Sequence, residues 1–409
     1  MKKALLIIGI QLLLAELVCF VLLQFYLFPQ HRRFFYEDYE QHFNNIPQKL
    51  ITQFAGHDQI LAADVKFDSE LGWDNVPMIS GMHEGCRGKP WFFSFDDDTG
   101  RNTPTKTSKD DAQISLYGGS FTLGAEVNDN QTWQYYLEQL SGETVRNYGV
   151  GGYGTDQALF KLERNLKRGL KTPVIVIGIF SAAMPRLLTT YRPFYAPYGG
   201  LEMGFKPMLQ KTAEGSYDWL PSALTDIGVG ENIRVAFDKA AEDDYYYAQN
   251  KEKPHMGFPY ILTTLRVTKY MFFDYEKERV LWAAGHEASD KMDEIIKRFI
   301  ALSQSEQFFP VVVFMPQDPE LDRYEEKEPP FYATYLQRLR KRYSETDLLL
   351  IDILDEELDP KEFSPKGCHP SDYGHQIIAA AVNRELQTKN LIPGQINVVA
   401  KPPAAPEVD

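Results

Sequence analysis

The chain has 409 residues, of which 44% are hydrophobic and 24% charged, so it is long enough for one large domain or two smaller ones with a sizeable core. Its formal net charge of -14 argues against nucleic acid and against an anionic membrane surface as partners, and no long basic run offsets that charge.

A long apolar stretch opens the chain. Residues 4–28 are almost entirely apolar, and as a helix they would extend about 37 Å at about 1.5 Å per residue, enough to cross a bilayer. A cleavable signal peptide has a shorter apolar region and a cleavage site of small residues, and this sequence offers neither. We therefore predict an uncleaved, single-pass signal anchor over residues 1–31. The soluble part would then be extracytoplasmic, in the periplasm or at the cell exterior.

Charges in and around this segment leave two questions open. Lys2 and Lys3 favour a cytoplasmic N-terminus, but Arg32 and Arg33 stand just past the other end, so the positive-inside rule decides only weakly. Glu16, in the middle of the span, is costly in hydrocarbon. It is either a neutral, protonated side chain or a side chain that pairs with another helix.

Alternating strands and helices follow a less regular segment. Residues 32–112 look like a stalk and a loop-rich segment, in which the polar run FDDDTGRNTPTKTSKDD is typical of an exposed loop. From residue 114 onward, short apolar runs alternate with helical patterns, which predicts an α/β fold. The predicted strands are 114–118, 145–150, 173–180, 310–316 and 347–353, and the main predicted helices are 132–140, 155–166, 289–304, 331–343 and 371–386.

Five strands in this order predict a three-layer α/β/α sandwich with a mainly parallel, five-stranded sheet over residues 113–387. An aromatic- and proline-rich insertion at about 182–285 interrupts the alternation between the third and fourth strands. It would form either a lid or substrate-binding wall, or an irregular excursion with a small core of its own. The tail, residues 388–409, is expected to be disordered.

Serine and histidine stand at the ends of predicted strands. Ser120 follows the first strand, Gly152 the second, Ser181 the third and His369 the fifth. Because ligands bind beyond the carboxyl ends of the strands in an open α/β sheet, we expect these residues to converge. A serine hydroxyl needs a neighbouring base to attack an ester, and histidine has a suitable pKa. Each residue alone would more often be structural, and it is their joint occurrence that predicts a Ser120–His369 site.

These residues resemble the sequence blocks of the SGNH/GDSL hydrolases. GGSFTLG is similar to the first block, NYGVGGYGTDQ to the second and CHPSDYGHQ to the last; ELGW, GCRG and RPFY resemble a membrane-anchored bacterial branch of the superfamily. The resemblance covers roughly residues 68–386. It implies Ser120 as nucleophile, His369 as base, and an oxyanion hole built from the backbone N–H groups of Ser120 and Gly152. The implied substrates are acyl esters, often O-acetyl groups on cell-envelope carbohydrate.

Three positions depart from the family's pattern. Gly119 stands where the first block usually has aspartate, and Ser181 stands where the third block supplies an asparagine to the oxyanion hole. A serine hydroxyl is a shorter donor, and losing one such donor can cost about 10²–10³ in rate. Lys366 occupies the place of the usual acid, three residues before the histidine. Asp352, Asp359 or Asp372 would then be the third acid, or a backbone carbonyl would orient His369.

Cysteine and metal-ligand patterns complete the sequence-based expectations. Of the three cysteines, Cys19 lies in the span, and in an oxidising compartment Cys86 and Cys368 are expected to form a disulfide that pins the histidine loop; the alternative is two unrelated thiols. His375 reads as a structural residue of the last helix. No cluster has metal-ligand spacing, so we expect no metal and no cofactor.

The leading functional prediction is a membrane-anchored serine esterase that hydrolyses an acyl ester, chiefly acetyl, of a cell-envelope carbohydrate or lipid. Two alternatives remain. An O-acyltransferase would use the same Ser120 and His369, with a sugar hydroxyl in place of water. A catalytically inactive SGNH-fold protein would bind a glycan or an envelope partner through the same cleft, and the missing acid favours it. Neither the acyl acceptor nor the oligomeric state follows from the sequence.

Overall fold

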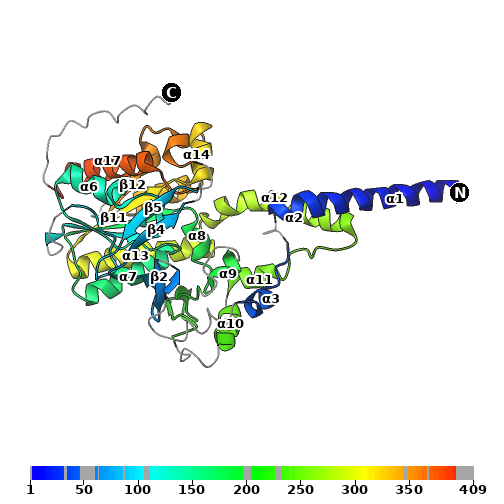
Figure 1. Cartoon of the computed structure of the whole chain (residues 1–409), viewed down its shortest axis with the longest axis horizontal. Coiled ribbons are helices and arrows are strands. Elements are labelled where there is room, and N and C mark those ends of the chain that lie inside the picture. The colour runs from blue at the N-terminus through cyan, green and yellow to red at the C-terminus, as the bar shows by residue number, and fades with distance from the viewer. Residues whose placement is uncertain are drawn as a thin grey trace. The chain divides into compact units, whose positions relative to one another are not determined.

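The computed structural model describes residues 2–31, 35–46, 60–62, 64–85, 88–105, 111–196, 204–225, 233–242, 244–344, 348–365 and 368–392 (Figure 1). The chain divides into two compact units. We call residues 75–180, 296–330 and 340–409 the sheet unit. Residues 1–74, 181–295 and 331–339 form the aromatic unit.

A five-stranded parallel sheet forms the centre of the sheet unit, as the sequence predicts. Its strand order is β12-β11-β8-β6-β7, from β6 (Ile114–Gly118), β7 (Val145–Asn147), β8 (Val174–Phe180), β11 (Phe309–Met315) and β12 (Leu349–Asp352). Every residue of β6, β7 and β8 is buried. The apolar run of β8, in which five of the seven residues are Val or Ile, suits a strand that is covered on both faces.

Helices cover both faces of this sheet, which confirms the predicted three-layer α/β/α architecture. Figure 1 shows α6 (Trp133–Ser141) and α17 (Asp372–Thr388) packed together on one face, with α7 (Thr155–Lys167) on the other. The Thr132 hydroxyl caps α6 and the Ser371 hydroxyl caps α17. The remaining helices that follow the strands of the sheet are α5 (Ser120–Leu123), α13 (Glu287–Glu306), α14 (Asp318–Glu325), α15 (Ala333–Arg342) and α16 (Pro360–Phe363).

Short strands occur in the segment for which the sequence analysis expected loops. One sheet has the order β1-β2-β3, from β1 (Ile60–Ala62), β2 (Val65–Asp68) and β3 (Gly72–Asn75), and its strands β1 and β2 are antiparallel. A hairpin pairs β4 (Ser80–Glu84) with β5 (Pro90–Ser94). Each strand has only three to five residues, and so short a run carries too little periodicity to be separated from a loop by pattern.

The aromatic unit has a core of rings. Residues Tyr39, Phe43, Tyr191, Phe194, Phe205 and Phe237 are buried against one another. The insertion at about 182–285 lies wholly in this unit and contributes four of these six rings. Its elements are α8 (Ala183–Arg186), α9 (Arg192–Tyr195), β9 (Met208–Lys211), β10 (Tyr217–Leu220), α10 (Ile233–Glu242), α11 (Tyr245–Asn250) and α12 (Tyr260–Leu281). Residues 39–46 pack on the same core, with α3 spanning Tyr39–Asn44.

The N-terminal segment of the aromatic unit is helical throughout. It comprises α1 (Lys2–Leu22), η1 (Leu23–Leu27) and α2 (Phe28–His31). The stretch Lys2–Leu27 is long and apolar enough to cross a membrane, although a signal sequence would meet the same criterion. At the other end of the chain, the last helix ends at Thr388, and most of the predicted disordered tail, from residue 393 onward, lies outside the described residues.

Candidate active site

The serine of the predicted site begins a helix directly after the first sheet strand. Ser120 is the first residue of α5 and is buried, with 8% exposure. A side chain on the residue before it, Gly119, would displace the Phe180 ring, because a Cβ there would lie 2.8 Å from that ring. The Phe180 ring in turn stacks on Phe121 with centroids 4.6 Å apart. This packing accounts for a glycine where the family resemblance would lead one to expect aspartate.

His369 reaches this serine. The distance between His369 Nε2 and Ser120 Oγ is 2.8 Å, within hydrogen-bond range, although the two residues are 249 positions apart. The histidine stands in the loop before α17, where the Ser364 hydroxyl donates to the carbonyl of Cys368 at 2.9 Å. The imidazole also packs against Phe121, with ring centroids 5.4 Å apart. The structure thus brings the two predicted residues together.

The acid beside the histidine is Glu126, which the sequence analysis did not name. Its Oε1 lies 2.7 Å from His369 Nδ1, so the imidazole is held between a hydroxyl and a carboxylate. The Glu126 side chain is 19% exposed and that of His369 is 28% exposed. Ser120, His369 and Glu126 therefore form a continuous hydrogen-bonded chain, the arrangement of a serine-hydrolase triad.

The three aspartates named as candidate acids make other contacts. Asp352 accepts from the backbone N–H of Leu354 at 3.1 Å, and Asp359 accepts from the backbone N–H groups that open α16. Asp372 accepts from the hydroxyl of Tyr136. Glu126 therefore corrects the sequence-based choice, because it occupies the Nδ1 side of His369 while these carboxylates cap helices or bind a phenol. Lys366 lies outside the described residues.

A tight turn brings Glu126 back toward the serine. Helix α5 ends at Gly124 in the left-handed region, with φ of 79°, and the N–H groups of Gly124 and Ala125 both donate to the Ser120 carbonyl. Glu126 itself has a φ of 70°, a backbone conformation that a residue with a side chain rarely adopts. Such strain persists only where the surroundings hold it, and it is often found at functional sites.

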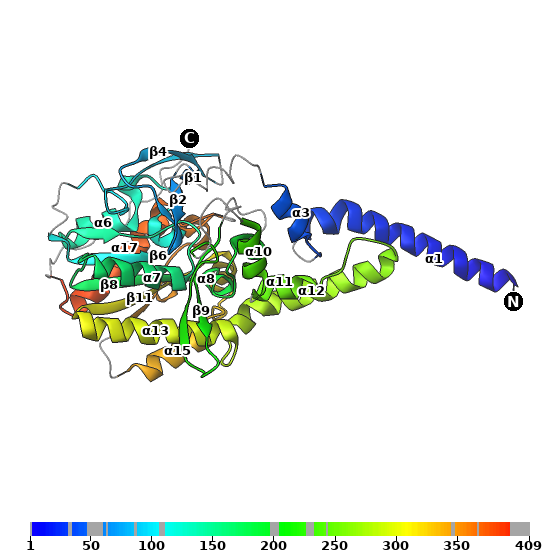
Figure 2. The same ribbon diagram turned by 90° about the horizontal axis from the view of Figure 1, so that it is seen from below.

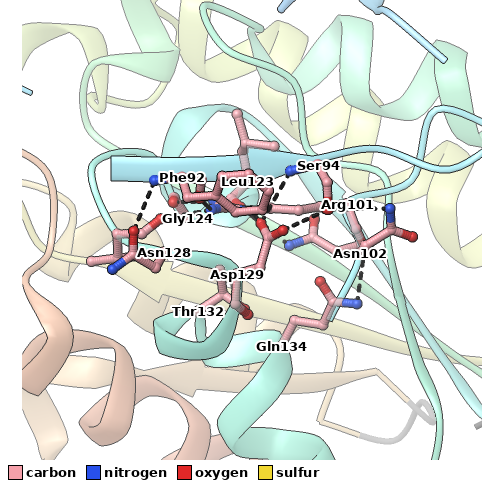
Figure 3. Close-up of polar contacts among 12 residues, drawn as sticks. Phe92, Ser94, Arg101, Asn102, Leu123, Gly124, Asn128, Asp129, Thr132 and Gln134 are labelled. Carbon is pink, nitrogen blue, oxygen red and sulfur yellow. Dashed lines mark hydrogen bonds and ion pairs between the residues drawn. The ribbon is translucent and has the colours of Figure 1, made fainter. Parts of the chain in front are cut away.

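A buried arginine holds this turn in place (Figure 3). The guanidinium of Arg101 donates to the carbonyls of Leu123, Gly124 and Val127, on both sides of Glu126, and to the carboxylate of Asp129 at 3.0 Å. Its side chain is fully buried. Burial raises the pKa of Asp129 even though this guanidinium is adjacent. Arg101 lies within the polar run 95–111, which the sequence analysis expected to be an exposed loop. Some charged side chains of this run, including Arg101 and Asp96, are in fact buried, and the composition of the run does not reveal this.

The β4–β5 hairpin also reaches Glu126. A Cβ on Gly85, at the turn of that hairpin, would lie 3.5 Å from Glu126 Oε2. The next residue in the chain is Cys86, which lies outside the described residues. Cys368, beside His369, is disulfide-bonded, and Cys19 is a free thiol. The Cys86–Cys368 pairing remains a prediction, and it would link the loop beside Glu126 to the loop of His369.

The predicted oxyanion donors stand at three strand ends. As the first residue of α5, Ser120 has a backbone N–H without a partner inside that helix. Gly152 follows β7 in a left-handed conformation, with φ of 82°. Ser181 directly follows the last residue of β8. It begins the segment 181–295 of the aromatic unit. The donor role of all three remains a prediction.

Other candidate ligands and cavities lie apart from the triad residues. His375 is fully buried, its Nδ1 accepts from the Trp133 backbone N–H at 3.2 Å, and burial lowers its pKa to about 3, so it is a neutral, structural residue. Among the described residues, no group of three His, Cys, Asp or Glu could hold a metal. A cavity of about 740 Å³ in the sheet unit has Tyr324, Asp352 and Pro360 among its lining residues and no triad residue.

Comparisons with known proteins gave similarities of structure only. No family model matches the chain, and no curated protein matches it. A G-D-S-L family lipolytic protein from Desulfitobacterium hafniense DCB-2 aligns with 67% of this chain and 99% of its own, at 12% identity and a TM-score of 0.34. A family two carbohydrate esterase from Clostridium thermocellum aligns with 71% of this chain and 67% of its own, at 11% identity and a TM-score of 0.32.

A salicylyl-acyltransferase from a tetracycline biosynthetic pathway aligns with 71% of this chain and 57% of its own, at 13% identity and a TM-score of 0.31. TM-scores this low do not establish a shared fold or function. The fold class therefore rests on the strand order and the flanking helices, and the chemistry rests on the triad geometry.

Proposed function

We propose that this protein is a serine esterase of the SGNH type, which cleaves acyl esters with Ser120 as nucleophile, His369 as general base and Glu126 as the acid that orients the histidine. One observation carries the proposal: the hydrogen-bonded chain from Ser120 Oγ through both imidazole nitrogens to the Glu126 carboxylate, with distances of 2.8 Å and 2.7 Å. Three residues in the required order and at hydrogen-bond distances define such a site by geometry rather than by sequence position.

The proposed mechanism gives each proton a place. With Nδ1–H donating to Glu126, neutral His369 presents an unprotonated Nε2 to the hydroxyl of Ser120. When Ser120 Oγ attacks the ester carbonyl, its proton passes to Nε2, and the Glu126 carboxylate stabilises the resulting imidazolium. The tetrahedral intermediate then expels the alcohol, which takes the proton from Nε2, and an acyl-serine remains.

The second half of the reaction removes the acyl group. His369 takes a proton from water, the resulting hydroxide equivalent attacks the acyl carbonyl, and the acid leaves as Ser120 recovers its proton. The predicted oxyanion donors, the N–H groups of Ser120 and Gly152 with the Ser181 hydroxyl, would stabilise both tetrahedral intermediates. Every step uses side chains, backbone N–H groups and water, so the proposal needs no metal or cofactor.

We propose acyl esters of cell-envelope carbohydrate or lipid, chiefly acetyl esters, as substrates. The family resemblance suggests this class, and the apolar helix Lys2–Leu27 suits an extracytoplasmic enzyme held at a membrane. The partial exposure of His369 and Glu126 is consistent with a bulky substrate that presents its ester at the surface.

Two alternatives use the same residues differently. An O-acyltransferase would pass the acyl group from Ser120 to a sugar hydroxyl, with His369 taking the proton of the sugar instead of that of water. A non-catalytic binding protein would retain the cleft without chemistry. Its main support was the absence of an acid near the histidine, and Glu126 removes that argument.

The test is turnover of p-nitrophenyl acetate and of acetylated glycans by the full chain in detergent. We expect hydrolysis that Ser120→Ala lowers by about 10⁴-fold or more, while Ser80→Ala, at an exposed serine of β4, retains it. Acetyl transfer to an added oligosaccharide, faster than release to water, would favour the transferase. Well-folded protein without turnover, and without acyl-serine in its intact mass, would contradict both enzymatic proposals.

A further inference from the structure

The N-terminal apolar helix packs against a second helix of the aromatic unit. Figure 2 shows α12 running beside α1, and the buried residues Leu23, Leu27 and Val267 share one cluster, with Tyr260 and Met271 packed on it. The ring of Phe20 lies 5.0 Å from that of Tyr260. Because the start of α12 meets the middle of α1 and its later residues share a cluster with η1, the two helices run parallel, in the same chain direction.

Glu16 accounts for the start of α12. Its carboxylate accepts from the backbone N–H of Tyr260 at 2.6 Å and lies 3.4 Å from the N–H of Ile261. Pro259, at the N-cap position of α12, makes no side-chain capping bond, so Glu16 supplies the cap from another helix. The positive end of the helix dipole also favours a carboxylate there. From the sequence, Glu16 was either a neutral side chain or one that pairs with another helix. This contact shows that it pairs with α12.

Polar side chains at this end of α12 are satisfied within the segment itself. The hydroxyl of Thr263 donates to the carbonyl of Gly257 at 2.9 Å, that of Thr264 to Tyr260 and that of Thr268 to Thr264, both at 2.8 Å. Internal bonding of this kind is what hydrocarbon requires, because lipid offers no partner to a polar group.

The same end of α12 presents large apolar side chains outward. We call residues 256–265 the α12 tip. Phe258 is 75% exposed, Leu262 52% and Leu265 62%. They lie beside α1, whose own outward residues are exposed and apolar, for example Leu13 at 72% and Leu17 at 57%. The apolar surface of the candidate span therefore continues onto the tip.

Helix geometry gives the depth of the tip. Glu16 precedes Leu27 by 11 residues, which is about 17 Å along the helix, roughly half of a bilayer core of about 30 Å. Along α12 from Tyr260 toward the C-terminal end of the helix, Arg266 lies after about 9 Å and Lys269 after about 14 Å. Both side chains are exposed. The apolar tip is thus deepest, and long basic side chains able to extend to the headgroups stand nearer the interface.

We propose that the α12 tip inserts into the bilayer leaflet beside α1, as a re-entrant hairpin that rests on lipid acyl chains and is capped in the membrane by Glu16. The protein would then be held by a span and a buried tip together, and α1 would be part of the folded aromatic unit rather than a removable leader. This inference rests on α1 as a membrane anchor and is independent of the proposed esterase activity.

The test places an environment-sensitive label at two matched positions of α12. In a Cys19→Ala background, Leu262→Cys and Val280→Cys replace exposed leucine and valine about 27 Å apart on the same helix. The full chain is labelled with a nitrobenzoxadiazole maleimide and reconstituted into phosphatidylcholine vesicles, with and without brominated acyl chains. Labelled Cys19→Ala protein corrects for the two remaining cysteines.

We expect the bromolipid to quench the label at position 262 strongly, with blue-shifted emission, and to leave the label at 280 nearly unquenched. Equal quenching at both positions, or none at 262, would overturn the proposal. A label at 262 that is shielded from lipid but cross-links two copies would also overturn it, because a second chain would then cover the tip.

A second variant tests the role of Glu16. Glu16→Ala removes the cap of α12, so we expect the bromolipid quenching at position 262 to fall by at least about half. Leu13→Ala, at an outward position of the same helix, should leave it unchanged. Glu16→Gln keeps one acceptor oxygen and should retain most of the quenching. Equal quenching in all three variants would contradict the capping role, even if the tip itself proved to be inserted.

Discussion

The sheet unit and the aromatic unit use buried polar groups in different ways. In the sheet unit, Arg101 and Asp129 hold a turn at both of its ends, and that turn carries Glu126. In the aromatic unit, the buried carboxylate of Asp244 binds the hydroxyl of Thr189 and backbone N–H groups at the start of α11. The first network supports a strained residue, Glu126, for which we propose a chemical role, whereas the second lies beside a core of rings.

This contrast predicts that changes in the two units have separable effects. Substitutions around the triad should reduce catalysis, or the stability of the sheet unit, without altering the aromatic core. Substitutions at Asp244 should lower the stability of the aromatic unit without reducing catalysis. The predictions below test this separation, beginning with the largest expected effect.

Removing the base should abolish catalysis without unfolding the protein. His369→Ala deletes the group that takes the proton of Ser120, and we expect kcat for p-nitrophenyl acetate to fall by about 10⁴-fold. The unfolding transition followed by circular dichroism should change little, since the imidazole is partly exposed. A loss of only a few-fold would mean that another group serves as the base.

Removing the buried guanidinium should destabilise the sheet unit. Arg101→Met leaves Asp129 buried without its ion pair and removes a donor from four backbone carbonyls, so we expect a loss of about 3–5 kcal/mol in the free energy of unfolding. The matched control is Arg168→Met, because Arg168 makes an exposed ion pair with Asp98 and its loss should cost less than about 1 kcal/mol. Equal effects of the two changes, measured by urea unfolding, would contradict the structural role of Arg101.

Removing the cap in the aromatic unit should have a smaller effect. Asp244→Ala deletes the acceptor for Tyr246, Tyr247 and Thr190 backbone N–H groups, so we expect a loss of about 1–3 kcal/mol. Turnover of p-nitrophenyl acetate at a temperature where the variant is folded should stay within a few-fold of the parent. A large loss of turnover in the folded variant would show that the two networks are not separate.

The same residue predicts a pH dependence of stability. Burial raises the pKa of Asp244 to about 6 from an ordinary value of 3.8, despite the hydrogen bonds that it accepts. Between these two values the folded state holds the proton more tightly than the unfolded state, so this carboxyl makes stability fall as pH rises from about 4 to about 6. Asp244→Asn should remove that part of the slope in urea unfolding measured at several pH values; an unchanged slope would contradict the assignment.

The sheet and two of the three triad residues could be predicted from sequence for a simple physical reason. Buried parallel strands require continuous apolar runs, and residues that follow such strands converge at one edge of the sheet. Ser120 begins α5, the helix after β6, and His369 stands in the loop before α17. Their joint occurrence after predicted strands, together with the family resemblance, predicted their pairing.

Glu126 could not be predicted in this way. It reaches His369 because the chain reverses at Gly124, because its own φ is 70°, and because Arg101 fixes the turn from a segment that reads as a solvated loop. The only sequence signal was a carboxylate six residues after Ser120, beyond a glycine that follows a short helix. The contact between Glu16 and α12 likewise joins residues 244 positions apart and leaves no local pattern.

The assignment of Glu126 as the acid is the central claim, and the rate of Ser120 phosphonylation tests it most directly. The second-order rate constant for a fluorophosphonate would be measured for the parent chain, Glu126→Gln and Asp372→Asn. We predict a loss of about 10²–10⁴-fold for Glu126→Gln and little change for Asp372→Asn, whose carboxylate binds Tyr136. A parent-like rate in Glu126→Gln, or the large loss in Asp372→Asn instead, would contradict the proposed triad.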